Sequence, residues 1–337
     1  MTTRKLLVTG PRLLRDMQTS ADLSKQMDRL AADLDAALVL RPPAQQWSED
    51  ELIEMVGDID LALCGGDQWS ARVMDAAPKL LAICKWGTGV NAIDLEAAAE
   101  RGIEVRNVPD AFSAPVSDTV LSFMLCFARK TPWLDRAIKS PAVGGQGGWE
   151  PIEGVSLSEC TLGVIGVGAI GSTVLHKARA FGMRTYGFDT RTPPERVIDQ
   201  TGVAMTDLDT LLAESDFISI NCDLNKSSHH LIDARALSKC KPTAVLINSA
   251  RGPIVKQADL TAALRAGTIA GAGLDVFETE PLAANDPLRS MDNVLLSPHL
   301  SQSSPRSCWR THERVMDNVR EAFAASARNR SLQGATP

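Results

Sequence analysis

Three glycines that follow a short apolar run are the clearest chemical signal in this chain. Residues 161–165 read TLGVI, which suits a buried strand, and Gly166, Gly168 and Gly171 follow as G-x-G-x-x-G. In such a turn the first glycine permits the bend, the second lets the backbone approach a pyrophosphate, and the third lets a helix pack on the strand. The N-terminus of that helix offers N–H groups to phosphate. The motif therefore predicts a dinucleotide site.

An acidic residue completes this unit. A second predicted strand, residues 184–188, ends in Asp189, about 20 residues beyond the glycines. A carboxylate there accepts hydrogen bonds from an adenosine ribose and repels a 2′-phosphate, so NAD is the expected cofactor. Arg191 stands two residues later, and an arginine nearby can accommodate the 2′-phosphate of NADP.

Three more reactive side chains follow predicted strands, at the sheet edge where open α/β proteins bind ligands. Arg251 follows the strand at 244–248, and Glu280 and His299 come after two later strands. An arginine can hold a carboxylate through two hydrogen bonds. A histidine can exchange a proton with a hydroxyl or carbonyl group, and a glutamate can pair with the imidazolium.

The elements that must position these residues alternate along the chain. Apolar runs at strand spacing and helical spacing follow one another through the first hundred residues and again after residue 189. Such alternation predicts α/β architecture with parallel sheets covered by helices. The predicted strands are residues 5–9, 37–40, 61–64, 80–84, 104–106, 161–165, 184–188, 217–222, 244–248, 272–277 and 293–296. Long helices are predicted at 113–129 and 305–325.

Composition narrows the class of protein. A chain of 337 residues with 44% apolar content suits two globular domains. The net charge of −6 provides no general attraction for nucleic acid or an anionic membrane. Seven scattered cysteines without C-x-x-C spacing predict neither a disulfide framework nor a metal site. No apolar run reaches membrane-spanning length and no signal peptide is evident, so a soluble cytoplasmic protein is expected.

The order of several motifs makes the chain resemble the D-isomer-specific 2-hydroxyacid dehydrogenases over nearly its whole length. They are KWGTGVNAIDLEAAAERGIEVRNVP at 85–109, LGVIGVGAIG at 162–171, LINSARG at 246–252, GLDVFETEP at 273–281 and LLSPH at 295–299. The resemblance implies two doubly wound domains, with a Rossmann NAD domain at residues 113–300 inserted into a flavodoxin-like substrate domain of residues 1–112 and 301–337. It also implies a phosphoglycerate, hydroxypyruvate or glyoxylate reductase-like enzyme that interconverts a small 2-oxo acid and its D-2-hydroxy acid.

The resemblance also assigns roles to residues. It implies that Arg251 binds substrate, that His299 is the acid/base and that Glu280 is its partner. The implied cofactor-binding residues are Gly166, Gly168, Ala169, Ile170, Gly171, Asp189, Cys222, Ala250 and Asp275. The implied substrate-binding residues, besides Arg251, are Thr88, Gly89 and Val90, because the resemblance implies that the backbone of the loop at 87–90 meets the substrate carboxylate. Lys85, just before this loop, is a further candidate substrate-binding residue.

The chain departs from the family pattern in three places. Residues 221–224 read NCDL where many members have His-x-Pro-Leu, so the adenine pocket is expected to be lined differently. Residues 116–118 read VSD where Val-Ala-Glu is usual. After His299 comes LSQS instead of a small Gly/Ala-rich run, which predicts a substrate pocket of different shape.

Two other functions stay open. A phosphorylated substrate such as 3-phosphoglycerate needs a cationic site, for which Lys85 and Arg106 are candidates. A corepressor that senses NAD needs an exposed peptide-binding cleft and often longer tails, and the short tails here argue against it.

The Gly-rich segment at 140–154 predicts a connector in which Trp149 docks on the same chain or on a second subunit. With the resemblance, this favours a two-fold dimer.

Overall fold

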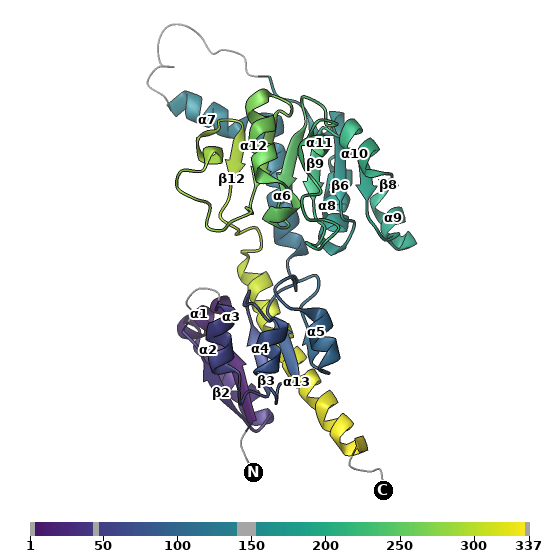
Figure 1. The fold of residues 1–337 in the computed structure, drawn as a ribbon. Coiled ribbons are helices and arrows are strands. Elements are labelled where there is room, and N and C mark those ends of the chain that lie inside the picture. The colour runs from purple at the N-terminus through teal and green to yellow at the C-terminus, as the bar shows by residue number, and fades with distance from the viewer. Residues whose placement is uncertain (1–3, 43–46, 140–152, 334–337) are drawn as a thin grey trace. The chain divides into compact units, whose positions relative to one another are not determined.

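The computed structural model describes residues 4–42, 47–139 and 153–333, and it separates into two compact units (Figure 1). The terminal unit consists of Met1–Ala111 and Ser304–Pro337, and the inserted unit is Phe112–Ser303. The predicted α/β class and the insertion of one unit into the other are confirmed. Trp149 and most of the predicted 140–154 loop lie outside the described residues.

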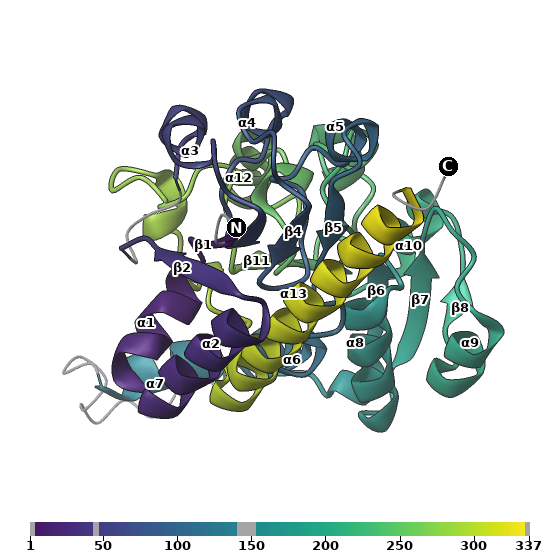
Figure 2. The same cartoon turned by 90° about the horizontal axis from the view of Figure 1, so that it is seen from below.

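The terminal unit is built on a parallel five-stranded sheet of order β2-β1-β3-β4-β5. The strands are β1 (Arg4–Val8), β2 (Ala36–Leu40), β3 (Leu61–Cys64), β4 (Ala82–Lys85) and β5 (Glu104–Arg106). One face is covered by α1 (Pro11–Thr19), α2 (Ala21–Asp33) and α13 (Pro305–Gln333), and the other by α3 (Glu49–Met55), α4 (Ala71–Asp75) and α5 (Leu95–Glu100), as Figure 2 shows. Alternate strand residues serve the two cores, so Leu6 packs with α13 while Leu7 packs with α3 and α4.

The inserted unit has a parallel seven-stranded sheet of order β12-β11-β10-β9-β6-β7-β8. The strands are β6 (Thr161–Ile165), β7 (Arg184–Phe188), β8 (Ala204–Met205), β9 (Phe217–Ile220), β10 (Val245–Asn248), β11 (Gly271–Leu274) and β12 (Val294–Leu296). Helices α6 (Ser113–Arg129) and α8 (Ala169–Ala180) pack into one core, and α10 (Leu208–Glu214), α11 (Ala234–Leu237) and α12 (Gln257–Ala266) pack into the other. Strand order reverses between β6 and β9, so a ligand site is expected beside their carboxyl ends.

Four elements were not expected from the sequence: α1, α7 (Thr131–Lys139), α9 (Glu195–Thr201) and β8. All four are short or bury few side chains, and α9 buries only Thr201 among its seven residues. Helix α1 buries two residues, Leu13 and Leu14, α7 buries none of its residues, and β8 is two residues long.

The strand predicted at 272–277 ends earlier, at Leu274. Val276 and Phe277 are buried, and they continue the apolar pattern into the loop that follows. The residues beyond Leu274 therefore belong to a loop at the sheet edge, where they are available to a site.

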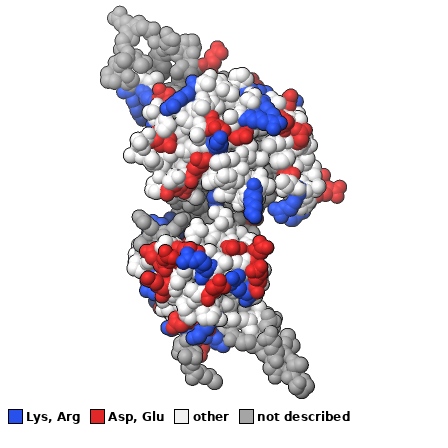
Figure 3. Space-filling view, in the orientation of Figure 1, with Lys and Arg blue, Asp and Glu red and all other residues white. Residues whose placement is uncertain are grey.

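Surface charge, cysteine chemistry and helix apolarity complete the description of the two units. On the face drawn in Figure 3, acidic and basic side chains are interspersed. All seven cysteines lie within the described residues and are free thiols. Among the helices of the described residues, none is both long and apolar enough to cross a membrane.

Candidate active site

The glycine loop lies between β6 and α8, and each of its three positions requires or suits glycine for a different local reason. Gly166 has φ +91°, and a Cβ there would stand 2.5 Å from the backbone nitrogen of Cys222. A Cβ on Gly171 would lie 2.0 Å from the Gly166 carbonyl oxygen, so this glycine lets the helix pack closely. A Cβ on Gly168 would meet nothing within 4 Å, which leaves open space in front of the loop for a phosphate.

The remaining residues of this motif continue the same unit. Ala169 and Ile170 form the first turn of α8, whose N-cap is Gly168. Asp189 follows β7, and its carboxylate accepts hydrogen bonds from the backbone N–H groups of Val167 (2.8 Å) and Arg191 (2.9 Å). The acid is therefore fixed against the glycine loop, on the side where an adenosine ribose is expected.

Two buried polar atoms at the ends of neighbouring strands fit a bound dinucleotide. Asn221 Oδ1 follows β9 and Ser249 Oγ follows β10, and neither atom has a hydrogen-bond partner among the described residues. Buried polar atoms normally have partners, so their position beside the switch point fits groups made to contact a cofactor. Cys222 is partly buried beside Gly166 in the same region. The residues present thus fit the dinucleotide that the glycine loop predicts.

Glu280 and His299 are brought together as the sequence predicts. Glu280 Oε2 lies 2.7 Å from His299 Nδ1, and the side chains are 36% and 39% exposed. Glu280 Oε1 accepts a hydrogen bond from the Phe277 N–H at 3.1 Å. With Nδ1 occupied by the carboxylate, Nε2 is the histidine nitrogen left to exchange a proton with a ligand.

The charge on Glu280 is favoured at neutral pH. Burial acts to raise the pKa of Glu280, but the hydrogen bond and charge of His299, the Phe277 amide and the charge of Arg251 together lower that pKa below its usual value. The carboxylate therefore stays ionised wherever a histidine titrates.

Asp275 holds the histidine loop in place. This fully buried residue follows β11, and its carboxylate accepts hydrogen bonds from the N–H groups of Leu300 (3.0 Å) and Ser301 (2.9 Å). Its carbonyl oxygen accepts the His299 N–H at 2.8 Å, and His299 itself has φ +54°. These contacts fix the backbone from which the imidazole projects.

Arg251 is partly buried at the end of β10. Its Nη1 donates to the Ala250 carbonyl oxygen at 2.6 Å. Burial lowers the pKa of Arg251, and the negative charges of Glu280 and Asp223 offset part of that effect. A guanidinium in this setting keeps its charge at neutral pH.

Gly252 joins the arginine loop to the glutamate loop. A Cβ at Gly252 would lie 1.8 Å from the Phe277 carbonyl oxygen, so the two backbones touch directly. The loop that carries Arg251 therefore sets the position of the residues leading to Glu280.

A second histidine–glutamate pair, not predicted from the sequence, supports the same loops. His230 Nε2 lies 2.8 Å from Glu278 Oε1, which also accepts the Gln257 N–H at 3.2 Å. The His230 N–H donates to the Pro253 carbonyl oxygen at 2.8 Å. The signals available in the sequence are the His-His doublet at 229–230 and a second acid two residues before Glu280.

The remaining predicted substrate residues lie in the terminal unit, Lys85 at the end of β4 and the others in the loop that follows it. Lys85 Nζ donates to the Trp86 carbonyl oxygen at 2.7 Å, and Thr88 Oγ1 donates to the Val108 carbonyl oxygen at 3.0 Å. Gly89 and Val90 are partly exposed. In the described parts of the chain, no cluster of three or more His, Cys, Asp or Glu could hold a metal ion.

A parallel α/β unit with a glycine loop at its switch point and a histidine–carboxylate pair at the same sheet edge is typical of a dinucleotide-dependent oxidoreductase. The model of the D-isomer specific 2-hydroxyacid dehydrogenase family, NAD binding domain, matches residues 121–301. The chain belongs to this family. It is thus an enzyme that acts on small 2-hydroxy or 2-oxo acids with NAD(P).

Known proteins resemble the chain over most of its length. A glyoxylate reductase of Thermofilum pendens is 38% identical over 285 residues, which cover 82% of each chain. The D-lactate dehydrogenase from Aquifex aeolicus, solved with NAD and lactic acid, superposes with a TM-score of 0.81 at 26% identity over 96% of both chains. An NADPH-dependent glyoxylate/hydroxypyruvate reductase from Sinorhizobium meliloti, solved with NADP and malonate, gives 0.78 at 29% identity over 96% of this chain and 94% of that one.

Proposed function

We propose that this dehydrogenase reduces glyoxylate or a similarly small, unphosphorylated 2-oxo acid, with His299 as acid/base, Glu280 as its partner and Arg251 as the carboxylate-binding residue. The observation that carries the proposal is the 2.7 Å contact between Glu280 Oε2 and His299 Nδ1, which leaves Nε2 for the substrate. The small substrate is suggested by the glyoxylate reductase relative.

The chemistry follows from these groups. The glycine loop and Asp189 would hold the dinucleotide, which when bound would supply or accept the hydride at substrate C2. In reduction, His299 Nε2 donates a proton to the carbonyl oxygen, and in oxidation it removes that proton. Such proton transfer typically increases the reaction rate by about 10² to 10⁴-fold. Glu280 accepts the Nδ1–H and stabilises the imidazolium. The planar fork of Arg251 holds the carboxylate in register for the transfer.

The terminal unit is assigned to the substrate and the inserted unit to the cofactor. For Thr88, Gly89 and Val90 we propose that the loop backbone meets the carboxylate, and Lys85 is proposed as a substrate-binding cation beside that loop. Asp275 is assigned to positioning the His299 loop, because both of its carboxylate oxygens accept N–H groups from that loop.

NAD is the proposed cofactor in preference to NADP. The fixed carboxylate of Asp189 supports this preference, since it suits a ribose diol and repels a 2′-phosphate. The NADP-bound relative and the nearby Arg191 are the reasons to test it. The measurement is kcat/KM for NADH and NADPH with the same acid, and equal values would contradict the preference.

The phosphorylated alternative receives less support from the contacts of its candidate cations. Lys85 Nζ is directed to the Trp86 carbonyl oxygen, and Arg106 forms ion pairs with Glu104 and Glu321. A screen of glyoxylate, hydroxypyruvate, phenylpyruvate and 3-phosphohydroxypyruvate tests the substrate. Highest kcat/KM with the phosphorylated acid would favour the alternative. The corepressor function has no support among these contacts, and steady NADH oxidation would exclude it as the sole role.

A cytoplasmic two-fold dimer is the proposed assembly. Leu125 of α6 and Leu134 and Ile138 of α7 are exposed apolar side chains, which suit a self-complementary face. The free thiols suit a reducing compartment. Light scattering at micromolar concentration tests the dimer, and a monomer mass would refute it.

A further inference from the structure

The loop after β4 is held by hydrogen bonds along its length. Gly87, with φ +105°, accepts the Val108 N–H on its carbonyl oxygen at 2.9 Å. Thr88 donates its hydroxyl to the Val108 carbonyl oxygen and accepts Asn107 Nδ2 on its own carbonyl oxygen at 2.6 Å. The segment at 107–108 therefore fixes the backbone at 87–88.

Helix α13 contacts Trp86 and Asn107, the residues that adjoin this loop, with two buried polar side chains. His312 and Asn318 are 1% and 2% exposed, on a helix whose neighbouring residues Val315, Met316 and Val319 form apolar core. Asn318 Nδ2 donates to the Asn107 carbonyl oxygen at 2.8 Å, behind the loop. Polar groups buried in apolar surroundings are destabilising unless paired, so these two side chains need their partners.

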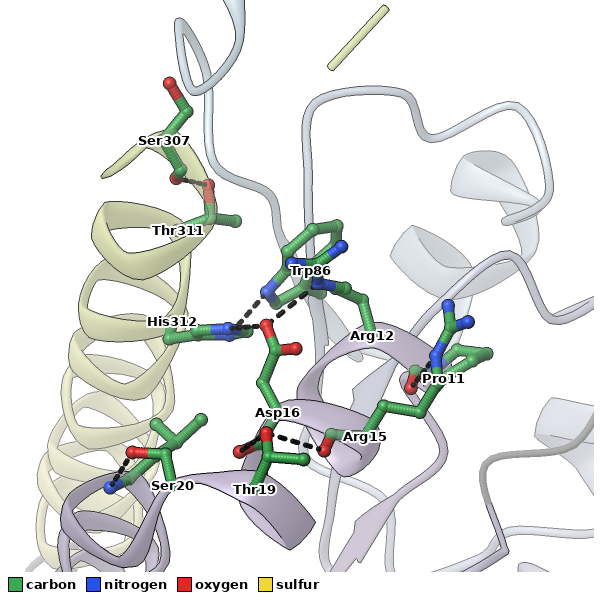
Figure 4. Close-up of polar contacts among 11 residues, drawn as sticks. Pro11, Arg12, Arg15, Asp16, Thr19, Ser20, Trp86, Ser307, Thr311 and His312 are labelled. Carbon is green, nitrogen blue, oxygen red and sulfur yellow. Dashed lines mark hydrogen bonds and ion pairs between the residues drawn. The ribbon is translucent and has the colours of Figure 1, made fainter. Parts of the chain in front are cut away.

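His312 lies between Trp86 and Asp16 (Figure 4). Trp86 is the residue directly before the loop, and its Nε1 donates to His312 Nδ1 at 2.9 Å. An indole nitrogen can only donate, so Nδ1 must be unprotonated and Nε2 must carry the proton. Nε2–H then donates to Asp16 Oδ2 at 2.9 Å, and the same oxygen accepts Arg12 Nε at 2.8 Å.

We propose that His312 and Asn318 are positioning residues that hold the substrate-carboxylate loop at 87–90, His312 through the Trp86 side chain and Asn318 through Asn107. This inference rests on the proposed function of that loop. The chain Arg12–Asp16–His312–Trp86 anchors the indole at the loop entrance, and the chain Asn318–Asn107–Thr88 anchors its middle. Loss of either chain lets the loop N–H groups move from the positions that a carboxylate requires.

The test uses near-isosteric variants. Trp86→Phe removes the indole donor and keeps an aromatic ring, and Asn318→Leu removes the amide at similar size. Thr311→Val is the matched control, because Thr311 is fully buried on the same helix and, among the described residues, its hydroxyl bonds only to the Ser307 carbonyl oxygen within that helix. Readouts are KM and kcat for glyoxylate, KM for NADH, and the Ki of oxalate as a carboxylate probe that cannot be reduced.

Trp86→Phe and Asn318→Leu are expected to raise the glyoxylate KM and oxalate Ki by about five- to thirtyfold, the size of one or two lost hydrogen bonds. kcat and the NADH KM should change far less, and Thr311→Val should match wild type. Two further variants, His312→Asn and His312→Gln, test the two contacts of His312 separately. Asn places an amide oxygen near the Nδ1 position that faces Trp86, while Gln places its amide near Nε2. His312→Asn should therefore lie closer to wild type in KM than His312→Gln.

Wild-type KM and Ki in both Trp86→Phe and Asn318→Leu would overturn the inference, as would an equal rise in Thr311→Val. If a His312 variant fails to fold, the first two variants decide the question alone. Failure of the wild-type enzyme to reduce any acid of the screen would instead refute the proposed substrate, so the two failures are distinguishable.

Discussion

The two units hold their functional residues in different ways. In the inserted unit, short loops at one sheet edge carry the Glu280–His299 pair and the glycine turn, and backbones that touch directly, such as those of Gly252 and Phe277, fix these loops. In the terminal unit, His312 of α13 donates to Asp16 of α1 and accepts a hydrogen bond from Trp86, the residue directly before the loop at 87–90. The candidate site residues of the inserted unit are thus fixed by local backbone packing, whereas this loop of the terminal unit adjoins hydrogen bonds between residues far apart in sequence.

The largest effect is expected from removing the acid/base group itself. His299→Ala should reduce kcat with glyoxylate by about 10² to 10⁴-fold at every pH, because it removes the proposed proton donor. NADH binding, measured by fluorescence titration, should stay near wild type, since the glycine loop is untouched. Activity within tenfold of wild type would mean that the proton is carried elsewhere.

Local packing in the inserted unit can be tested with a pair of glycines. Gly252→Ala puts a methyl group 1.8 Å from the Phe277 carbonyl oxygen, so both loops must shift, and a misplacement of that kind can reduce kcat/KM by about 10²-fold. Its melting temperature should fall as well. Gly168→Ala places its methyl in open space. That variant should keep the melting temperature of wild type and raise the KM for NADH, and equal melting temperatures for both variants would contradict the packing account.

The placement of the candidate site residues at one sheet edge of the inserted unit was predictable because its signals are local. Strand, glycines and Asp189 lie within about 30 residues, as βαβ dinucleotide units do. Arg251, Glu280 and His299 each follow a strand, and parallel strands end at one edge. The contact of His312 with Trp86 and Asp16 could not be predicted, because nothing in an isolated helix pattern says which buried polar residue meets which distant side chain. The His230–Glu278 pair was not predicted because both residues lie in loops, and no periodic pattern relates two loop residues this far apart in sequence.

The charge of Glu280 gives a pH test of intermediate size. Burial acts to raise the pKa of Glu280, but the hydrogen bond and charge of His299 lower it below its usual value. With the proposed roles, kcat/KM for glyoxylate should therefore fall as pH decreases through that lowered pKa, because a protonated Glu280 no longer stabilises the imidazolium. Glu280→Gln keeps the shape but has no charge to lose, so its kcat/KM should be lower than that of wild type at neutral pH and should not show this fall. Profiles are compared at saturating NADH, with Glu278→Gln as the neighbouring control. If wild type and Glu280→Gln have the same pH profile, Glu280 is not the partner of His299.

The smallest effect concerns stability, and it tests the long-range network in the terminal unit. Burial lowers the pKa of His312, the charge of Arg12 adds to this, and the hydrogen bond and charge of Asp16 offset part of it. In the unfolded chain the imidazole takes up a proton near pH 6.5. Between the folded pKa and that value the unfolded state binds more protons, so stability falls as pH decreases through about 6.5. Asp16 does not interfere, because burial acts to raise its pKa but hydrogen bonds from Arg12 and His312 lower it, and its contribution is lost only as pH falls through that lowered pKa.

The melting temperature of wild type should therefore drop more than that of His312→Asn between about pH 7 and pH 5, since asparagine cannot titrate there. Taking the difference between the two proteins cancels the titration of groups they share. Thr311→Val should follow the wild-type curve, because it leaves His312 and Asp16 unchanged. Parallel curves for wild type and His312→Asn would show that His312 binds its proton equally well in both states. The assignment of a buried neutral tautomer to His312 would then be wrong. The proposed donation from Trp86 that holds the loop entrance would be wrong with it.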